Sequence, residues 1–227
     1  MKRLSIVLVV LFTNCILFAQ DLNQFDANGQ RHGEWKKTFK NTKVTRYQGQ
    51  FDHGKEIGTF NFYKNIDGKA VLTATKVFNA DNDVAQVTFL SSNKRKISEG
   101  KMRGRNHIGK WVIFHNKSDQ VMTEELYNDK GKLEGLRQVY YLSGQVAEKA
   151  LYRDGLLHGE ANWFAENGKL IKVITYKNDK FDGVYKAYNK EGVIATEGHY
   201  RDDAKCCVWK RFKNGTVVEE KDLDKKG

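Results

Sequence analysis

The chain has 227 residues, with 39 Lys and Arg against 28 Asp and Glu, and a formal net charge of +11. Hydrophobic residues make up 40% of it and aromatic residues 12%, which excludes a disordered polyelectrolyte. With three cysteines and no proline, the composition excludes disulfide scaffolds and collagen-like chains. The lack of proline also favours hydrogen-bonded strands, because proline removes a ladder donor.

Residues 1–19 are predicted to be a secretory signal peptide. Lys2 and Arg3 form a charged start, and residues 4–18 form an apolar run interrupted only by Thr13 and Asn14. This run is short for a spanning helix, which needs about 20 apolar residues, although an uncleaved N-terminal anchor is an alternative. Removing the two basic residues lowers the net charge from +11 to +9. We therefore expect an exported protein that is periplasmic, outer-membrane-associated or secreted.

A period of about 24 residues runs along the rest of the chain. One series of tyrosines recurs at steps of 25, 24 and 24, and consists of Tyr127, Tyr152, Tyr176 and Tyr200. A second series consists of turn glycines, Gly33, Gly58, Gly109, Gly135, Gly159 and Gly183, with Cys207 in the glycine position of the last unit. The period predicts a short lead at 20–27, a repeat array of about eight units at 28–223, and a charged tail at 224–227. The unit at 72–98 is degenerate.

Each unit is predicted to be a β-hairpin. In the unit from Tyr152 to Tyr176, residues 160–164 and 169–176 form the strands, and Asn167-Gly168 supplies two positive-φ residues for a tight turn. The same turn signal recurs at Asp67-Gly68, Ser143-Gly144, Glu191-Gly192 and Asn214-Gly215. Four units also carry Gly-x-x-x-Gly between hairpins. We expect left-handed backbone at one glycine and close approach of strands at the other.

These units resemble the MORN repeat, and more closely its bacterial variant form. The resemblance depends on Asn28-Gly-Gln-Arg-His-Gly-Glu-Trp35 and Asp154-Gly-Leu-Leu-His-Gly-Glu160, supported by Gly131-Lys-Leu-Glu-Gly135 and Asn178-Asp-Lys-Phe-Asp-Gly183. It implies an all-β chain of antiparallel hairpins laid side by side into an elongated, twisted, single-layer sheet. Some bacterial variants carry an antitoxin label, but the predicted export signal argues against a cytoplasmic antitoxin.

No motif in the chain is typical of an enzyme. There is no phosphate-binding loop, no nucleophile elbow and no His-Glu-x-x-His sequence, so we predict a non-catalytic protein without a cofactor. Glu134, His158, Asp182 and Cys206 occupy equivalent positions of successive units, but such positions lie about 10 Å apart, too far to share one metal ion. We therefore predict no metal site.

The three cysteines have different contexts. Cys15 lies inside the predicted signal peptide, where its neighbours make a poor lipidation site. Cys206 and Cys207 are adjacent, and adjacent Cα atoms lie about 3.8 Å apart, closer than in ordinary disulfides. We expect them to be packing residues, with a redox pair as the alternative.

Two groups of residues are candidates for a binding surface. The aromatic residues two positions after the turn glycines are Trp35, Phe60, Trp111, Tyr185 and Trp209. The one dense basic cluster contains Lys94, Arg95, Lys96, Arg103 and Arg105, together with Lys101. Because a single-layer sheet cannot cover both of its faces, some aromatic residues are expected to be exposed for binding.

The function predicted from these groups is that of an exported protein-binding or scaffolding module. Its partner would be another envelope or secreted protein. The alternative is electrostatic attachment to an anionic envelope surface, such as lipid headgroups or cell-wall polymer. Export argues against nucleic acid as the partner.

Overall fold

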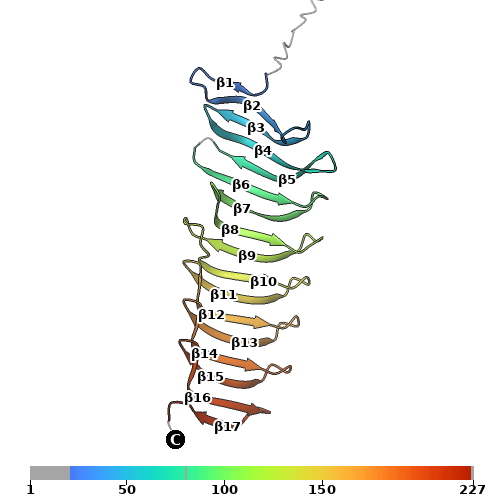
Figure 1. The fold of residues 1–227 in the computed structure, drawn as a ribbon. Coiled ribbons are helices and arrows are strands. Elements are labelled where there is room, and N and C mark those ends of the chain that lie inside the picture. The colour runs from blue at the N-terminus through green and yellow to red at the C-terminus, as the bar shows by residue number, and fades with distance from the viewer. Residues whose placement is uncertain (1–20, 80, 226–227) are drawn as a thin grey trace, which may run out of the picture.

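The computed structural model describes residues 21–79 and 81–225, so the signal peptide predicted at 1–19 lies outside the described residues. Within them there is no helix, and seventeen antiparallel strands form one open sheet (Figure 1). Each strand pairs with the strands next to it in sequence, from β1–β2 to β16–β17. The predicted all-β architecture of tandem hairpins is confirmed.

The strands divide into three groups along the sheet. The first group is β1 (Gln24–Phe25), β2 (Arg31–Thr38), β3 (Thr45–Asp52), β4 (Lys55–Ile66), β5 (Lys69–Phe78) and β6 (Val84–Leu90). The second is β7 (Lys96–Arg103), β8 (Asn106–Phe114), β9 (Val121–Tyr127), β10 (Gly135–Tyr140), β11 (Val146–Arg153) and β12 (Leu156–Phe164). The third is β13 (Leu170–Lys177), β14 (Lys180–Tyr188), β15 (Ile194–Arg201), β16 (Ala204–Lys213) and β17 (Thr216–Asp222).

The turns within hairpins differ from the prediction in one respect. At Asn167-Gly168 only the glycine has a positive φ, of 81°, and its N–H donates to the carbonyl of Ala165. The strand register shifts just before this turn, between Trp163 and Phe164. This is a longer loop with a glycine bulge, so the predicted two-residue turn is wrong here. Gly144 and Gly192 close their hairpins with the same hydrogen bond.

Tight turns with two positive-φ residues occur both between and within units. Asp154-Gly155, with φ values of 49° and 88°, lies between units. Asp67-Gly68, with values of 49° and 76°, and Asn214-Gly215, with values of 52° and 79°, lie within hairpins, where such turns were predicted. Aspartate and asparagine tolerate this left-handed backbone better than other non-glycine residues, which explains their place before the glycine.

The second glycine of Gly-x-x-x-Gly has left-handed backbone in all four units that carry the motif. A Cβ added to Gly33 or Gly58 would meet no atom within 4 Å, so the predicted close approach is wrong there. A Cβ added to Gly159 would come within 3.1 Å of the Leu151 side chain, so the close approach is confirmed in that unit. Cys207 has a φ of 62°, which confirms that it occupies the glycine position of its unit.

One row of side chains crosses the whole sheet and organises one of its faces. It takes one residue from each of β2–β17, and we call it the central row. The side of the sheet on which it lies is called the aromatic face. Its members are Trp35, Gly49, Phe60, Lys76, Val87, Gly100, Trp111, Glu125, Arg137, Ala150, Ala161, Ile174, Tyr185, Gly198, Trp209 and Lys221. Aromatic rings and glycines therefore lie next to one another across strands.

The rings of the central row lie directly on the backbone of these glycines. A Cβ built on Gly100 would come within 2.5 Å of the Trp111 ring, and one on Gly198 within 2.3 Å of the Trp209 ring. Phe60 covers Gly49 in the same way. Phe60 and Trp111 are each only 1% exposed, although no second layer covers them. A single sheet thus builds a core by laying large rings flat over positions that have no side chain.

A second set of contacts joins successive units along the edge where the inter-unit turns lie. The N–H of Gly155 donates to the carbonyl of Leu133, at 2.8 Å, and Asp179 donates likewise to Leu157, at 2.9 Å. The Asp179 carboxylate accepts the N–H of Leu157 in return, at 2.7 Å. These bonds stack each turn against the preceding one, which brings non-equivalent turn residues of neighbouring units into contact.

The ring-on-glycine contact can be tested at Gly100. We expect Gly100→Ala to lower the free energy of unfolding by about 1–3 kcal/mol, because its Cβ collides with the ring of Trp111. Trp111→Ala alone should cost about 3–5 kcal/mol. In the Trp111→Ala background, Gly100→Ala should be nearly neutral, because Ala150 and Ala161 already pair across strands in this way. Urea unfolding of the four proteins measures the coupling, and additive costs would contradict it.

Candidate binding surfaces

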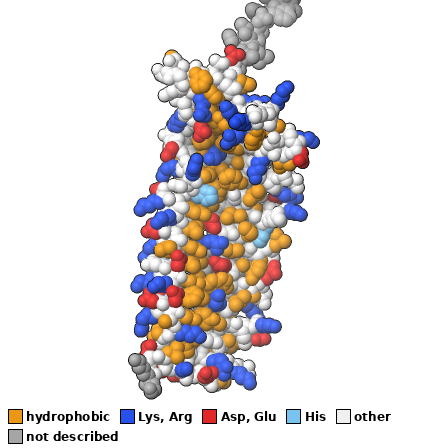
Figure 2. Space-filling model, in the orientation of Figure 1, with side chains coloured by type: hydrophobic (Ala, Val, Ile, Leu, Met, Phe, Trp, Pro, Cys, Tyr) orange, Lys and Arg blue, Asp and Glu red, His pale blue; other side chains and the backbone are white. Residues whose placement is uncertain are grey.

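The aromatic face carries a continuous cluster of rings over its C-terminal strands. Tyr176 lies 5.1 Å from Phe181 and Phe181 lies 5.2 Å from Tyr200, measured between ring centroids. Tyr200 and Tyr185 both contact Trp209, at 5.3 and 5.5 Å. All five residues are partly exposed. Figure 2 shows one face of the molecule, on which hydrophobic side chains gather along the length of the array and Lys and Arg stand at its margins.

The five aromatic residues of the predicted surface divide into two kinds. Trp35, Tyr185 and Trp209 are partly exposed and are therefore available for binding. Phe60 and Trp111 are buried against glycine, so the expectation that they form an exposed surface is corrected. Sequence spacing places all five residues in one row. It does not show which of the rings lie on a glycine and are covered by neighbouring rings.

An apolar hollow on the aromatic face lies over the degenerate unit. It has a volume of about 700 Å³ over β4–β7, and its lining includes Phe62, Ala74, Phe89, Met102 and Ile97. Ala74 pairs with Phe62 on one side and Phe89 on the other, and this small side chain leaves the space between the two rings open. The degenerate unit nevertheless forms regular strands in register with its neighbours.

This groove was not predicted, because its shape depends on a small residue between two large ones on different strands. Ile97 and Ile66 line it and are 48% and 40% exposed. Lys64 and Lys76 also line it, and the Lys76 ammonium lies 5.8 Å from the centroid of the Phe62 ring. The groove therefore combines an apolar floor with positive charge, which suits an apolar segment that also carries acidic groups.

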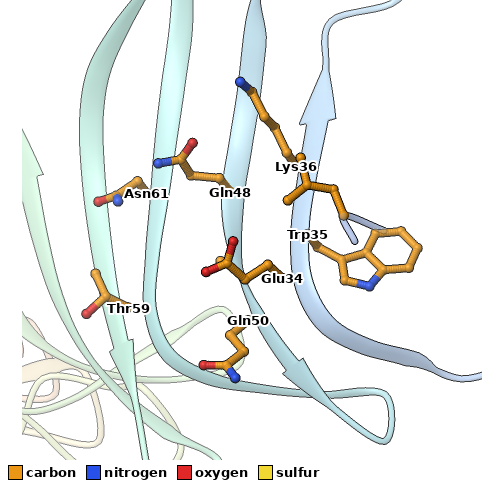
Figure 3. A pocket seen from close by; sticks show the side chains of 9 residues that line it. Glu34, Trp35, Lys36, Gln48, Gln50, Thr59 and Asn61 are labelled. Carbon is orange, nitrogen blue, oxygen red and sulfur yellow. The ribbon is translucent and has the colours of Figure 1, made fainter. Parts of the chain in front are cut away.

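The opposite face exposes several hydrophobic side chains, among them Leu126, Leu136 and Leu151. Near its N-terminal end, however, it holds an open polar pocket of about 290 Å³, whose lining includes Glu34 and Gln48. Figure 3 shows these side chains on neighbouring strands, with the indole of Trp35 projecting away from them. The pocket offers amide and carboxylate groups for hydrogen bonds but little apolar surface, so it lacks the usual character of a small-molecule site.

The basic cluster of the sequence does not form one patch. Lys94, Arg95 and Lys96 lie at the β6–β7 turn, whereas Arg103 and Arg105 lie at the other end of β7, a strand of eight residues. Such a strand spans about 26 Å, which is about three times the Debye length at physiological salt. Two of the charges are also paired. Lys96 contacts Glu99 at 2.8 Å, and Arg103 contacts both Asp83 and Asp129 at 3.2 Å.

Charged residues replace the ring in the middle of the central row. Arg137 contacts Glu125 at 3.2 Å and Glu148 at 3.1 Å, and the hydroxyl of Tyr127 donates to Glu125 at 2.7 Å. Glu125 is 13% exposed and Arg137 is 25% exposed, counting their side chains. The guanidinium thus balances two carboxylates between β9 and β11, at the position where the other units place aromatic or aliphatic side chains.

The two adjacent cysteines and His158 were considered above as members of possible redox and metal sites. The Sγ atoms of Cys206 and Cys207 lie 2.8 Å apart, Cys206 is buried, and neither forms a disulfide. A hydrogen bond with Cys206 is the main cause that raises the pKa of Cys207, to about 11, which disfavours a reactive thiolate. His158 contacts Asn178 instead of the other members of the ladder, with 3.2 Å between Nδ1 and Oδ1.

Residues 133–154, 157–178 and 181–202 match the sequence model of the MORN repeat variant family. These three consecutive units are therefore similar to MORN-variant repeats. They coincide with the hairpins from β10 to β15, where the tight inter-unit turns stack most regularly. No curated protein matches the chain. MORN repeats generally mediate binding to proteins or membrane lipids, and proteins built from them are typically non-catalytic. The described part of the chain contains no helix long and apolar enough to cross a membrane.

The charged network around Arg137 can be tested by substitution. We expect Arg137→Met to lower the free energy of unfolding by about 2–4 kcal/mol, because Glu125 and Glu148 are left without their cation. The control is Arg211→Met, which breaks an exposed pair with Glu219 and should cost at most about 1 kcal/mol. Equal losses in urea unfolding would show that the network contributes no more than a surface pair.

The partly buried tyrosines predict a loss of stability in alkali. Burial raises the pKa of Tyr127, Tyr152, Tyr176 and Tyr200 above the usual value of about 10. Because the folded pKa values are raised, this stability is complete below about pH 10 and is lost as the pH rises through them. Circular dichroism should show the sheet unfolding in this range. Combined Tyr152→Phe and Tyr176→Phe should move the transition to higher pH, and an unchanged transition would contradict the argument.

Proposed function

We propose that this protein is an exported, non-catalytic module that binds another envelope or secreted protein through the groove over β4–β7. The observation that carries the proposal is an open apolar groove on a face that no second layer covers. Phe62, Phe89 and Ile97 supply apolar area for burial, and exposed apolar area of this kind commonly marks a protein-binding site. Lys64 and Lys76 favour a partner segment that combines apolar and acidic side chains.

Several features support protein binding over purely electrostatic attachment to an anionic surface. The basic residues lie at opposite ends of β7, and Lys96 and Arg103 are already paired with carboxylates. A lipid or cell-wall surface would require a patch of uncompensated charge within a Debye length. The groove, in contrast, unites residues of four neighbouring strands in one place.

The proposal is tested by capture of partners from the envelope fraction of the native cells, washed at low and then moderate salt. We expect one defined protein to be retained by the tagged chain through both washes and lost with Ile97→Lys. The half-exposed Ile97 lines the groove, so the added charge opposes apolar binding without disturbing the fold. Val77→Lys is the control, because Val77 is equally exposed, at 48%, and is not among the residues that line the groove.

Each result has a distinct meaning. Retention by both variants would contradict binding in the groove. Release of a mixed anionic fraction at moderate salt would favour electrostatic attachment instead, because exposed charges are screened by salt. Flotation with anionic and neutral vesicles separates a lipid surface from cell-wall polymer in that case.

A further inference from the structure

Three metal-ligating side chains converge at the N-terminal end of the array, outside the groove. His32 lies on β2, Asp52 ends β3, and His53 follows it in the β3–β4 turn, with a φ of 44°. One ligand atom from each lies within 4.8 Å of the others, and this is the one such group among the described residues. The stacking of inter-unit turns causes this convergence, because Gly54 donates its N–H to the carbonyl of Arg31 at 2.8 Å.

The distances suit one small cation. Asp52 Oδ1 lies 3.5 Å from Nδ1 of His32 and 3.8 Å from Nε2 of His53. Metal–ligand bonds of about 2.0–2.1 Å at a tetrahedral zinc ion place neighbouring ligand atoms about 3.3 Å apart. Since all three side chains are at least 47% exposed, small rotations bring them to that separation. The equivalent positions of the ladder considered above are too far apart for this.

The hydrogen bonds of the two imidazoles indicate which nitrogen of each can bind a metal. Nδ1 of His53 lies 2.6 Å from Oδ2 of Asp26, so this nitrogen carries the proton and Nε2 is left free to bind. Nδ1 of His32 accepts the backbone N–H of His53 at 3.4 Å, a long hydrogen bond that uses the one lone pair of this nitrogen. A cation bound by Nδ1 of His32, Nε2 of His53 and the Asp52 carboxylate therefore replaces this one long bond and keeps the bond between His53 and Asp26.

Asp26 fixes the orientation of His53 as an outer carboxylate does at histidine–metal sites. Its Oδ1 accepts the backbone N–H groups of Asn28 and Gln30, at 2.9 and 2.8 Å, which holds the carboxylate in place. Its side chain is only 8% exposed. The hydrogen bond with Asp26 raises the pKa of His53, so protons compete with a metal at low pH.

No other described unit has the same combination of two histidines and a carboxylate within reach of one another. The turn at Asn128 has the same backbone bonds, since its Oδ1 accepts the N–H groups of Lys130 and Lys132. Its side-chain amide, however, faces Asp154 at 3.4 Å, where the first unit has His53. In the unit of His158, the facing residue is Asn178. The ligand set is therefore a property of the N-terminal units and not of the repeat pattern.

From this geometry we propose that His32, Asp52 and His53 form a binding site for a divalent transition-metal ion, Zn²⁺ in particular, with Asp26 positioning His53. Two imidazoles and one carboxylate are ligands that zinc prefers, and three protein ligands leave one position for water. The site lies at the turn edge of β2–β4, apart from the apolar groove, and does not depend on the proposed function.

The first test is zinc titration of the untagged full chain by calorimetry at about pH 8, where histidines are mostly neutral. We expect one zinc ion per chain, and at least a tenfold weaker affinity for His53→Ala and for His32→Ala. The matched control is His158→Ala, at the position equivalent to His32, which should bind as the wild type does. Absence of binding, or equal affinity in His53→Ala, would overturn the proposal.

The Asp26→Asn variant tests whether Asp26 positions His53 for metal binding, as distinct from stabilising the fold. The amide oxygen keeps the turn bonds, as Asn128 does in its own unit, whereas the amide N–H₂ toward Nδ1 places the histidine proton on Nε2. We expect zinc affinity to fall about 10–100-fold with the thermal unfolding of the metal-free protein nearly unchanged. Unchanged affinity would overturn the role of Asp26. Cobalt(II) in place of zinc should give no thiolate charge-transfer band, and such a band would assign the metal to the cysteine pair.

Discussion

The fold depends on aromatic rings that lie flat on glycine backbone across neighbouring strands. A one-layer sheet has no second layer to bury its side chains, so a large residue can be covered only by residues of the same face. Gly49, Gly100 and Gly198 provide positions where a ring can descend to the backbone, and neighbouring rings then close over its edges. This explains how Trp111 reaches the burial of a core residue in an open sheet. It also explains why each ring needs a small partner in an adjacent strand.

The units that lack this contact show how the sheet accommodates its loss. Ala150 and Ala161 replace glycine and ring together, so that neither a clash nor a large cavity results, and both are almost completely buried. Glu125 and Arg137 replace them with a salt bridge. In the degenerate unit the central row holds Lys76 and the fully buried Val87. The groove proposed for binding lies beside them, where Ala74 stands between two phenylalanines.

The sequence period was sufficient to predict the fold, because alternation and turn residues are local signals. The hairpins, the aromatic row and the glycine position of Cys207 all follow from it. Contacts between side chains of different strands could not be predicted from the period. The turn at Asn167-Gly168 depends on a bulge in the register, and the role of Gly100 depends on which residue lies across from it. His53 was missed because comparison of equivalent positions overlooks contacts between non-equivalent ones, which only the stacking of the turns brings together.

The two ends of the array differ in the residues that lie at the open edge of the sheet. At the N-terminal end β1 pairs with β2 over two residues, and the side chain of Asp26 reaches His53 in the β3–β4 turn. Terminal units of repeat arrays have only one neighbour and open first, so a link across two turns limits fraying at that end. At the C-terminal end no described strand pairs with the outer side of β17, which carries Glu219, Glu220 and Lys221. Such charges oppose the addition of another strand, so the sheet edge is poorly suited to a partner and the aromatic face is better suited.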